Sequence, residues 1–267
     1  MVEPVLRSAL LALVVAGCSS SPEEPEEPLA DPVIDARCDG DPAAPRVLMF
    51  SRENLWVHDS TPVARQTVLE LCREHGFNVV ASVDPRAFNP DQLQETDVIV
   101  FGVTSGEVLD EPSRKSFEAW VRAGGGVIGI HAASATEVDW PFFRSNIGGT
   151  FGGHADHFTG RAMLENRTHP VLAAVTAPVI DRFDEWYSFT SHPEADGVTV
   201  LMSLDEQTMP PGYPDVLRMG YHAISWVHEP YGGRVFYTAL GHYPDIYAEP
   251  WFRDLLYDAI RWTAHRI

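Results

Sequence analysis

The chain has 267 residues, of which 45% are hydrophobic and 21% charged, a composition that fits a globular protein of one large or two small domains. It carries 38 Asp and Glu against 19 Lys and Arg, which gives a formal net charge of −19. Such a chain repels phosphate backbones and anionic headgroups, so we expect neither nucleic-acid binding nor electrostatic adhesion to membranes.

Residues 1–18 have the pattern of a bacterial lipoprotein signal. The apolar run over residues 5–17 is too short for a stable membrane span, but it suits the apolar region of a signal peptide. It ends in Val-Ala-Gly before Cys18, which resembles a lipobox; an ordinary cleaved signal is the alternative. We therefore expect a lipid anchor on Cys18 at the bacterial cell envelope, with Ser19 consistent with sorting to the outer membrane.

Residues 19–45 have the composition of an acidic, proline-rich tether. They hold six prolines and eight acidic residues against one basic residue, Arg37, so they are expected to stay extended and disordered, with the folded domain over 46–267. If Cys18 carries lipid, Cys38 and Cys72 remain as one possible disulfide pair. The alternative is that Cys72 is a buried, unpaired cysteine on the apolar side of a helix.

Residues 46–267 alternate short apolar runs with amphipathic stretches. Strands are predicted over 46–51, 78–82, 97–102, 127–130 and 199–204, then a hairpin of 223–228 with 234–240. Helices are predicted from Pro62 to a stop at Gly76, over 111–123, and over 250–264. This order predicts an α/β fold with an open, mostly parallel sheet, whereas residues 141–198, rich in Gly, Pro and His, are expected to form loops around the site.

Histidines follow three of the predicted strands. His58, with Asp59 beside it, comes after the first strand, His131 after the fourth and His242 after the last. In open α/β sheets the ligand crevice lies beyond the carboxyl ends of the strands, so these imidazoles are expected to converge there. Converging imidazoles suit a divalent metal, Zn²⁺ above all, or proton transfer.

His131 lies in a segment that resembles a nucleophile elbow. The sequence Gly129-Ile130-His131-Ala132-Ala133 has small residues on both sides of the central position, which permits a tight strand-to-helix turn. The tip carries an imidazole rather than a hydroxyl or thiol, so acyl transfer is not expected. A metal ligand or a proton carrier is expected instead.

Several stretches together resemble the trehalose-utilisation (ThuA-like) domain over roughly residues 46–265. They are His58-Asp59-Ser60, the segment around His131, Thr136-Glu137, Asp139-Trp140, Asp184-Glu185-Trp186-Tyr187, His222-Ala223-Ile224-Ser225-Trp226 and the segment from Gly233 to His242. The resemblance implies a flavodoxin-like fold related to class I glutamine amidotransferases. In those enzymes a Cys occupies the elbow, so His131 implies that amidotransferase activity is absent. The family is linked to the metabolism of disaccharides and their oxidised 3-keto forms.

The resemblance also implies one carboxylate in the site, from Asp184 or Glu185, as a ligand, a general base or an orienter of His131; a solvated acidic loop is the alternative. Trp56, Trp186 and Tyr187 have flat apolar faces that suit stacking on a sugar ring; the alternative for most of the seven tryptophans is a place in the core.

Two further histidine positions are weaker candidates. The spacing of His154 and His157 is not that of a helical zinc pair, so only one of them, His154, is expected to face the crevice. His222 precedes a strand and is expected either to bond a sugar hydroxyl or to lie on the surface.

Three functions remain open from the sequence. The first is a carbohydrate-active hydrolase, lyase or isomerase in which His58, His131 and His242 hold a divalent metal and Glu185 completes the shell. The second is a metal-free glycosidase or lyase that uses Glu185 and His131 as an acid/base pair. The third is a non-catalytic sugar-binding lipoprotein. No nucleotide cofactor is expected. The residues assigned to catalysis are His131, Glu185 and His242, and those assigned to substrate binding are Trp56, Asp59, His154, Asp184, Tyr187 and His222.

Overall fold

A computed structural model of the whole chain describes residues 34–193 and 197–267. The predicted signal, the lipidation site at Cys18 and the first part of the predicted tether lie outside the described residues.

Five parallel strands form one half of the sheet, in the order β3 (Asn78–Ser82), β2 (Arg46–Phe50), β4 (Val98–Gly102), β5 (Gly126–Ile130) and β12 (Val235–Thr238). Every residue of β4 and β5 is buried. Unbroken apolar runs of this kind are typical of parallel strands covered on both faces. The four strands predicted in the N-terminal half are therefore confirmed within a residue or so at each end.

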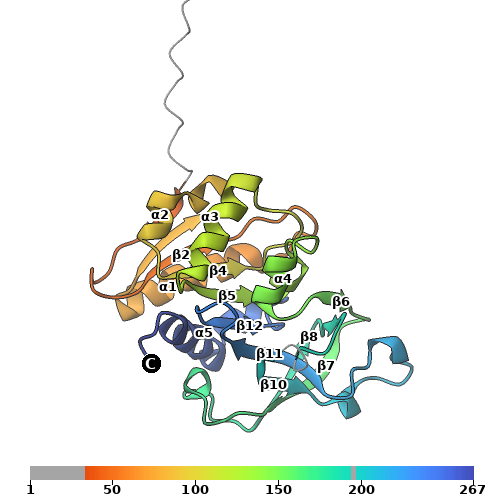
Figure 1. Cartoon of the computed structure of the whole chain (residues 1–267). Helices are drawn as coiled ribbons and strands as arrows, with labels where there is room; N and C mark the ends of the chain where they lie inside the picture. The colour runs from red at the N-terminus through yellow and green to blue at the C-terminus, as the bar shows by residue number, and fades with distance from the viewer. Residues whose placement is uncertain (1–33, 194–196) are drawn as a thin grey trace, which may run out of the picture. The chain divides into compact units, whose positions relative to one another are not determined.

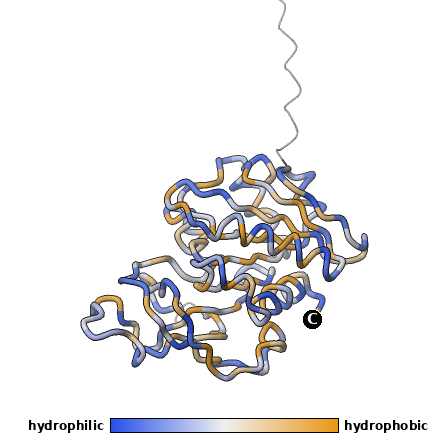
Figure 2. Tube along the Cα trace, turned by 180° about the vertical axis from the view of Figure 1, so that it is seen from behind, coloured by the Kyte–Doolittle hydropathy of each residue, from blue (hydrophilic) through white to orange (hydrophobic). Residues whose placement is uncertain are grey.

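Helices cover both faces of this half (Figure 1). On one face, α1 (Thr61–His75) contacts α5 (Pro250–Thr263). On the other face, α3 (Glu111–Arg122) packs against α2 (Pro90–Gln94), and its Phe117 ring contacts Phe143 of α4 (Pro141–Ile147). Figure 2 shows apolar stretches following the strands through the interior, and polar stretches following the outer loops.

The helix ends explain why these segments fold where they do. Gly76 adopts the left-handed conformation (φ 75°) that stops α1, as predicted. The Asp110 side chain accepts a hydrogen bond from Ser113 N and so caps α3. Among the described residues, no helix is long and apolar enough to cross a membrane.

Antiparallel strands form the second half of the sheet. The predicted hairpin is confirmed, because β11 (His222–His228) pairs antiparallel with β12. The sheet then continues through β10 (Thr199–Leu204), β7 (Phe158–Leu164) and β8 (Val179–Asp184), so within the described residues it has ten strands.

The expectation that residues 141–198 form only loops is wrong. The segment contains α4, β7 and β8, and a small separate sheet of β6 (Phe151–Gly153) with β9 (Ser188–Phe189). β8 is an edge strand of sequence VIDRFD whose side chains are mostly exposed or half-buried, so it lacks the apolar run that marks a strand in sequence. Backbone pairing with β7 makes it a strand despite its polar side chains.

The predicted tether is also corrected at its C-terminal end. Ile34–Cys38 forms β1, which pairs antiparallel with β3 at the edge of the sheet. Cys38 makes a disulfide with Cys72 of α1, so the possible pairing is confirmed and the alternative of an unpaired Cys72 is wrong. The acidic, proline-rich composition predicts disorder because it offers little apolar area to bury. The segment is ordered all the same, because backbone pairing with β3 and the disulfide hold it.

Candidate functional site

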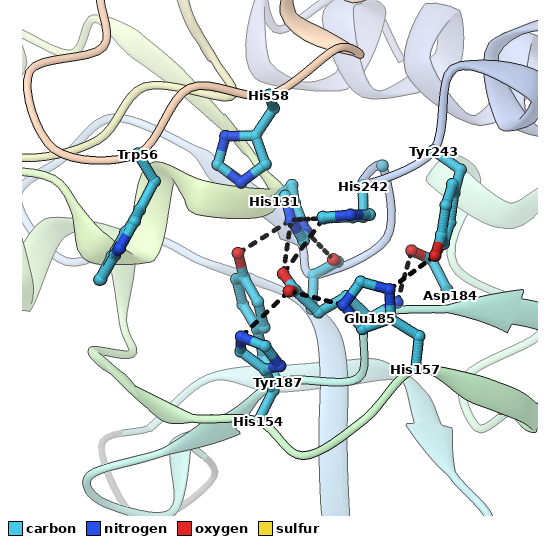
Figure 3. A network of polar contacts seen from close by, with 12 residues as sticks. Trp56, His58, His131, His154, His157, Asp184, Glu185, Tyr187, His242 and Tyr243 are labelled. Atoms are coloured by element: carbon cyan, nitrogen blue, oxygen red, sulfur yellow. Dashed lines mark hydrogen bonds and ion pairs between the residues drawn. The ribbon is translucent and has the colours of Figure 1, made fainter.

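The three strand-end histidines meet at the carboxyl end of the parallel strands (Figure 3). Their ring centroids lie 5.1 Å apart for His58 and His131, 5.5 Å for His58 and His242, and 5.2 Å for His131 and His242. Each comes from a loop after a different strand, β2, β5 or β12, and these strands are brought to one edge by the parallel topology. The expected convergence is confirmed.

The backbone at His131 is held in an unfavourable conformation. Its φ is 52°, in the left-handed region that side chains other than glycine rarely adopt and that costs about 1–3 kcal/mol. The buried Tyr237 hydroxyl lies 2.8 Å from the His131 carbonyl oxygen, to which it can donate. Two residues earlier, a Cβ added to Gly129 would lie 3.0 Å from the Tyr237 ring, so this position favours a small residue. The elbow predicted from sequence therefore has the strained geometry of its type.

The ring of His131 is oriented by a backbone carbonyl. Its Nδ1 lies 2.7 Å from the oxygen of Ala239, which only accepts, so Nδ1 carries the proton and donates. Burial lowers the pKa of His131 to about 4, which keeps the imidazole neutral at pH 7. Its Nε2 lone pair therefore faces the cluster, where the Tyr187 hydroxyl donates to it at 2.8 Å.

A carboxylate orients His58 in the same way. Nδ1 of His58 donates to Oε1 of Glu53 at 2.9 Å, and the same oxygen accepts from the His58 backbone N at 2.8 Å. The His58 side chain is only 7% exposed. This leaves Nε2 for the cluster, an arrangement in which a carboxylate typically supports a metal-ligating histidine. Sequence reasoning missed Glu53, although its position five residues before His58 in one loop is visible.

Glu185 lies at the centre of the cluster, and its side chain is 8% exposed. Its Oε2 lies 3.2 Å from His131 Nε2 and 3.2 Å from His242 Nδ1, and these two nitrogens are 3.3 Å apart. Burial alone would raise the pKa of Glu185, but the contacts with His131 and His242 outweigh it and hold that pKa far below its usual range. In turn, the charge and hydrogen bond of Glu185 outweigh burial and raise the pKa of His242.

The other oxygen of Glu185 contacts a second pair of histidines. Oε1 lies 3.0 Å from Nε2 of His154 and 3.0 Å from Nε2 of His157. The expectation that only His154 faces the crevice is therefore corrected. The two residues lie in an irregular segment between β6 and β7, so the helical spacing by which zinc pairs are recognised does not apply. The side chains of His154, His157 and His242 are 35, 26 and 23% exposed, so solvent reaches the cluster on this side.

Two residues expected to bind substrate lie beneath the site instead. Asp184 is fully buried, its Oδ1 accepts from the backbone N of Glu185 at 2.9 Å, and burial raises its pKa to about 6. His222 is also fully buried, with Nδ1 2.9 Å from Glu206 and Nε2 2.8 Å from the carbonyl oxygen of Tyr187. Both ring nitrogens are engaged, so its role is to hold the backbone of Tyr187. Neither side chain has a surface that a substrate could touch.

The remaining residues predicted to bind substrate differ in how deeply they are buried. Tyr187 is buried and its ring stacks on His131, with ring centroids 4.4 Å apart, so the expectation that it stacks on a sugar ring is wrong. Trp56 stands at the rim and is 44% exposed, whereas Asp59 is exposed beside His242 and its charge helps to raise the pKa of that histidine. Trp186 is buried and donates to the Phe158 carbonyl oxygen, so the expectation that it stacks on a sugar is wrong.

Comparison with known proteins agrees with this architecture. The structure of a ThuA-like protein from Bacteroides uniformis has a TM-score of 0.70 and 25% identity, covering 83% of this chain and 92% of that one. A ThuA-like protein from Parabacteroides merdae has a TM-score of 0.67 and 18% identity, with 83% and 90% covered. A β-galactosidase from Bacillus circulans shares the fold over 82% of this chain and 31% of its own, with a TM-score of 0.52 and 10% identity.

Comparison with curated proteins finds no significant match. The family described as trehalose utilisation matches residues 46–263, which contain every residue of the cluster. The chain therefore belongs to the trehalose-utilisation (ThuA) family.

Proposed function

We propose that this protein is a divalent-metal-dependent enzyme that acts on a carbohydrate, with the ion held by His58, His131, Glu185 and His242. The observation that carries the proposal is the convergence of three imidazoles and one carboxylate, whose ligand atoms all lie within 4.8 Å of one another. This donor set suits Zn²⁺, although other divalent transition metals accept it as well.

The hydrogen-bond directions favour a cation at this point. In His58 and His131, Nδ1 donates a hydrogen bond to an oxygen outside the cluster. In the neutral rings, each Nε2 therefore presents a lone pair to the cluster. The ionised Oε2 of Glu185 faces the His131 lone pair at 3.2 Å. Two electron-pair donors repel each other at this distance in a buried site, and a cation held between them would turn that repulsion into attraction.

The spacing of the donors fits a tetrahedral site. With metal–ligand distances of about 2.0–2.1 Å, two ligands of a tetrahedral Zn²⁺ lie about 3.3 Å apart. The three donor distances among His131, Glu185 and His242 are 3.2, 3.2 and 3.3 Å. A bound ion would polarise a carbonyl or hydroxyl oxygen of the substrate.

The Tyr187 hydroxyl is the proton donor beside this point. It lies 2.8 Å from Nε2 of His131, and burial raises its pKa well above the ordinary value, so it keeps its proton at neutral pH. When His131 Nε2 binds the ion, it can no longer accept the hydrogen bond of Tyr187. We propose that the Tyr187 hydroxyl then donates to an oxygen of the bound substrate.

A carbohydrate substrate is supported by the family and by the rim of the site. The Ser105 hydroxyl accepts from Trp56 N at 3.0 Å and donates to Trp56 O at 2.8 Å, which fixes the backbone of this exposed tryptophan. The indole also packs edge-on against Phe151, with centroids 5.4 Å apart. A flat aromatic face held at the rim suits stacking on a sugar ring. We propose a disaccharide or glycoside, including its keto forms, that is cleaved or isomerised.

The test combines metal analysis with turnover. Protein purified without chelator is analysed for bound metal and then assayed on a panel of disaccharides and 3-keto-glycosides, alongside His131→Ala and the exposed control His75→Gln. We expect metal and turnover in the wild type and the control, and loss of both in His131→Ala. Turnover without metal would favour the acid/base alternative, and tight sugar binding without turnover would favour a binding protein.

We also propose that a lipid on Cys18 holds the protein at the bacterial cell envelope. The Cys38–Cys72 disulfide supports an oxidising compartment, because such bonds seldom persist in a reducing cytoplasm. Labelled fatty acid should be incorporated into the full chain expressed in a Gram-negative cell and not into Cys18→Ala. Equal labelling of the two would refute the proposal.

A further inference from the structure

Glu185 joins two groups of histidines, one at each oxygen of its carboxylate. We propose that a second divalent cation is held by His154, His157 and Oε1 of Glu185, so that Glu185 bridges two ions. The inference rests on the proposed first site, whose ion Oε2 of the same carboxylate would ligate. In Figure 3 the dashed contacts of Glu185 run from the two oxygens in two directions, toward His131 and His242 and toward His154 and His157.

The hydrogen bonds of His154 support this second site. Its Nδ1 lies 2.8 Å from the carbonyl oxygen of Ala155, which only accepts, so Nδ1 carries the proton. In the neutral ring, Nε2 then presents a lone pair to the carboxylate oxygen of Glu185 at 3.0 Å. A neutral imidazole in this tautomer has no proton to offer that oxygen, whereas a cation would accept electron pairs from both.

His157 completes the donor set. Its Nδ1 lies 2.6 Å from the Tyr243 hydroxyl, which can accept the Nδ1 proton and leave the Nε2 lone pair directed at Glu185, 3.0 Å away. The Tyr243 hydroxyl would then accept the Nδ1 proton of His157, as the Ala155 carbonyl oxygen accepts that of His154. Two imidazoles and a carboxylate are the donor set of a zinc site that keeps a position open for water or substrate.

The local fold explains how histidines three residues apart reach one oxygen. Gly153 has φ 143°, which redirects the chain at the end of β6, and an added Cβ at Gly152 would lie 2.8 Å from the backbone of Phe189. The close pairing of β6 with β9 therefore holds this segment next to residues 185–189. Both glycines precede His154 directly, so the sequence places the histidines at the point where the chain turns toward Glu185.

Exposure indicates the order of binding. His58 and His131 are more deeply buried than His154 and His157. We therefore expect the first site to bind more tightly and the second to exchange first. Paired ions in enzymes lie about 3.5–4 Å apart and contact two oxygens of one substrate, which favours a sugar presenting two adjacent oxygens.

The test counts ions. Metal-free protein is loaded with excess Zn²⁺, freed of weakly bound metal by gel filtration and analysed by mass spectrometry for zinc per chain. We expect about two ions in the wild type and in His75→Gln, and about one in His154→Gln/His157→Gln. Thermal melting verifies that each variant is folded. If the double variant does not fold, His154→Gln alone is used in its place.

The outcomes separate this inference from the proposed function. One ion in the wild type that is lost in His131→Gln but kept in His154→Gln/His157→Gln would overturn the second site and leave the first standing. No bound ion in the wild type would overturn both. Loading with Co²⁺ gives a second readout: at two equivalents a carboxylate-bridged pair should show a weaker electron paramagnetic resonance signal than two isolated ions. A signal that simply doubles would contradict the bridge.

Discussion

Removing the carboxylate of Glu53 should weaken metal binding although Glu53 would not touch the metal. Its Oε1 accepts from both Nδ1 and the backbone N of His58, at 2.9 and 2.8 Å, and its side chain is 10% exposed. In Glu53→Ala the imidazole loses the partner that fixes its tautomer and ring orientation. Losses of such partners typically cost 10–100-fold in metal affinity, so we expect a rise in Kd equivalent to about 1.4–2.7 kcal/mol.

The assay is competition for Zn²⁺ against a chromophoric chelator. Glu53→Gln is the informative second variant: its amide oxygen can still accept one of the two hydrogen bonds without the charge, so its loss should be smaller than that of Glu53→Ala. Glu118→Ala, an exposed acid paired with Arg122 on α3, serves as the matched control and should bind like the wild type. An unchanged Kd in a folded Glu53→Ala protein would refute the idea that this carboxylate prepares His58 for a metal.

Three other predictions concern stability and turnover. The Cys38–Cys72 bond spans 34 residues, so its removal in Cys38→Ser/Cys72→Ser should cost about 4 kcal/mol in urea unfolding, and an unchanged midpoint would contradict this. The folded pKa of His131, about 4, lies below its unfolded value of about 6.5, so the unfolded chain takes up this proton first. In the metal-free protein, His131 should accordingly contribute a loss of about 3 kcal/mol in the free energy of unfolding as the pH falls from about 6.5 to about 4. His131→Gln should lack this contribution, and equal pH slopes of the two proteins in denaturant titrations would be evidence against a neutral buried imidazole. In Tyr187→Phe, loss of the hydroxyl should lower kcat on the order of 100-fold with metal content unchanged, and full activity would exclude Tyr187 as the proton donor.

The parts of the fold that sequence could predict are those with a strong apolar signal. The strands over 78–82 and 199–204 have the bounds predicted, because each carries a short run of apolar residues between polar residues. β8 was missed because it is a polar edge strand, held by backbone pairing. β1 was missed because it lies at the end of an acidic, proline-rich segment, a composition that predicts disorder. The disulfide that helps to order it is a contact between distant residues, and composition does not show it.

The candidate site divides in the same way. His58, His131 and His242 could be found because topology brings the ends of parallel strands together whatever the loops do. The contacts of His157 and Glu53 could not be predicted, because they depend on the path of irregular segments. The burial of Asp184 and His222 was likewise invisible, since a polar residue beside a motif looks the same in sequence whether it faces a ligand or supports the motif from beneath. That the two oxygens of Glu185 face different histidines is a fact of three-dimensional geometry alone.

The most direct measurement is a crystal structure of the zinc-loaded protein with anomalous diffraction recorded on both sides of the zinc absorption edge. We predict an anomalous peak about 2 Å from Nε2 of His131 and from Oε2 of Glu185, with His58 and His242 as the other two ligands. A well-ordered cluster with no peak there, or with zinc bound only elsewhere, would contradict the claim that these four side chains form a metal centre.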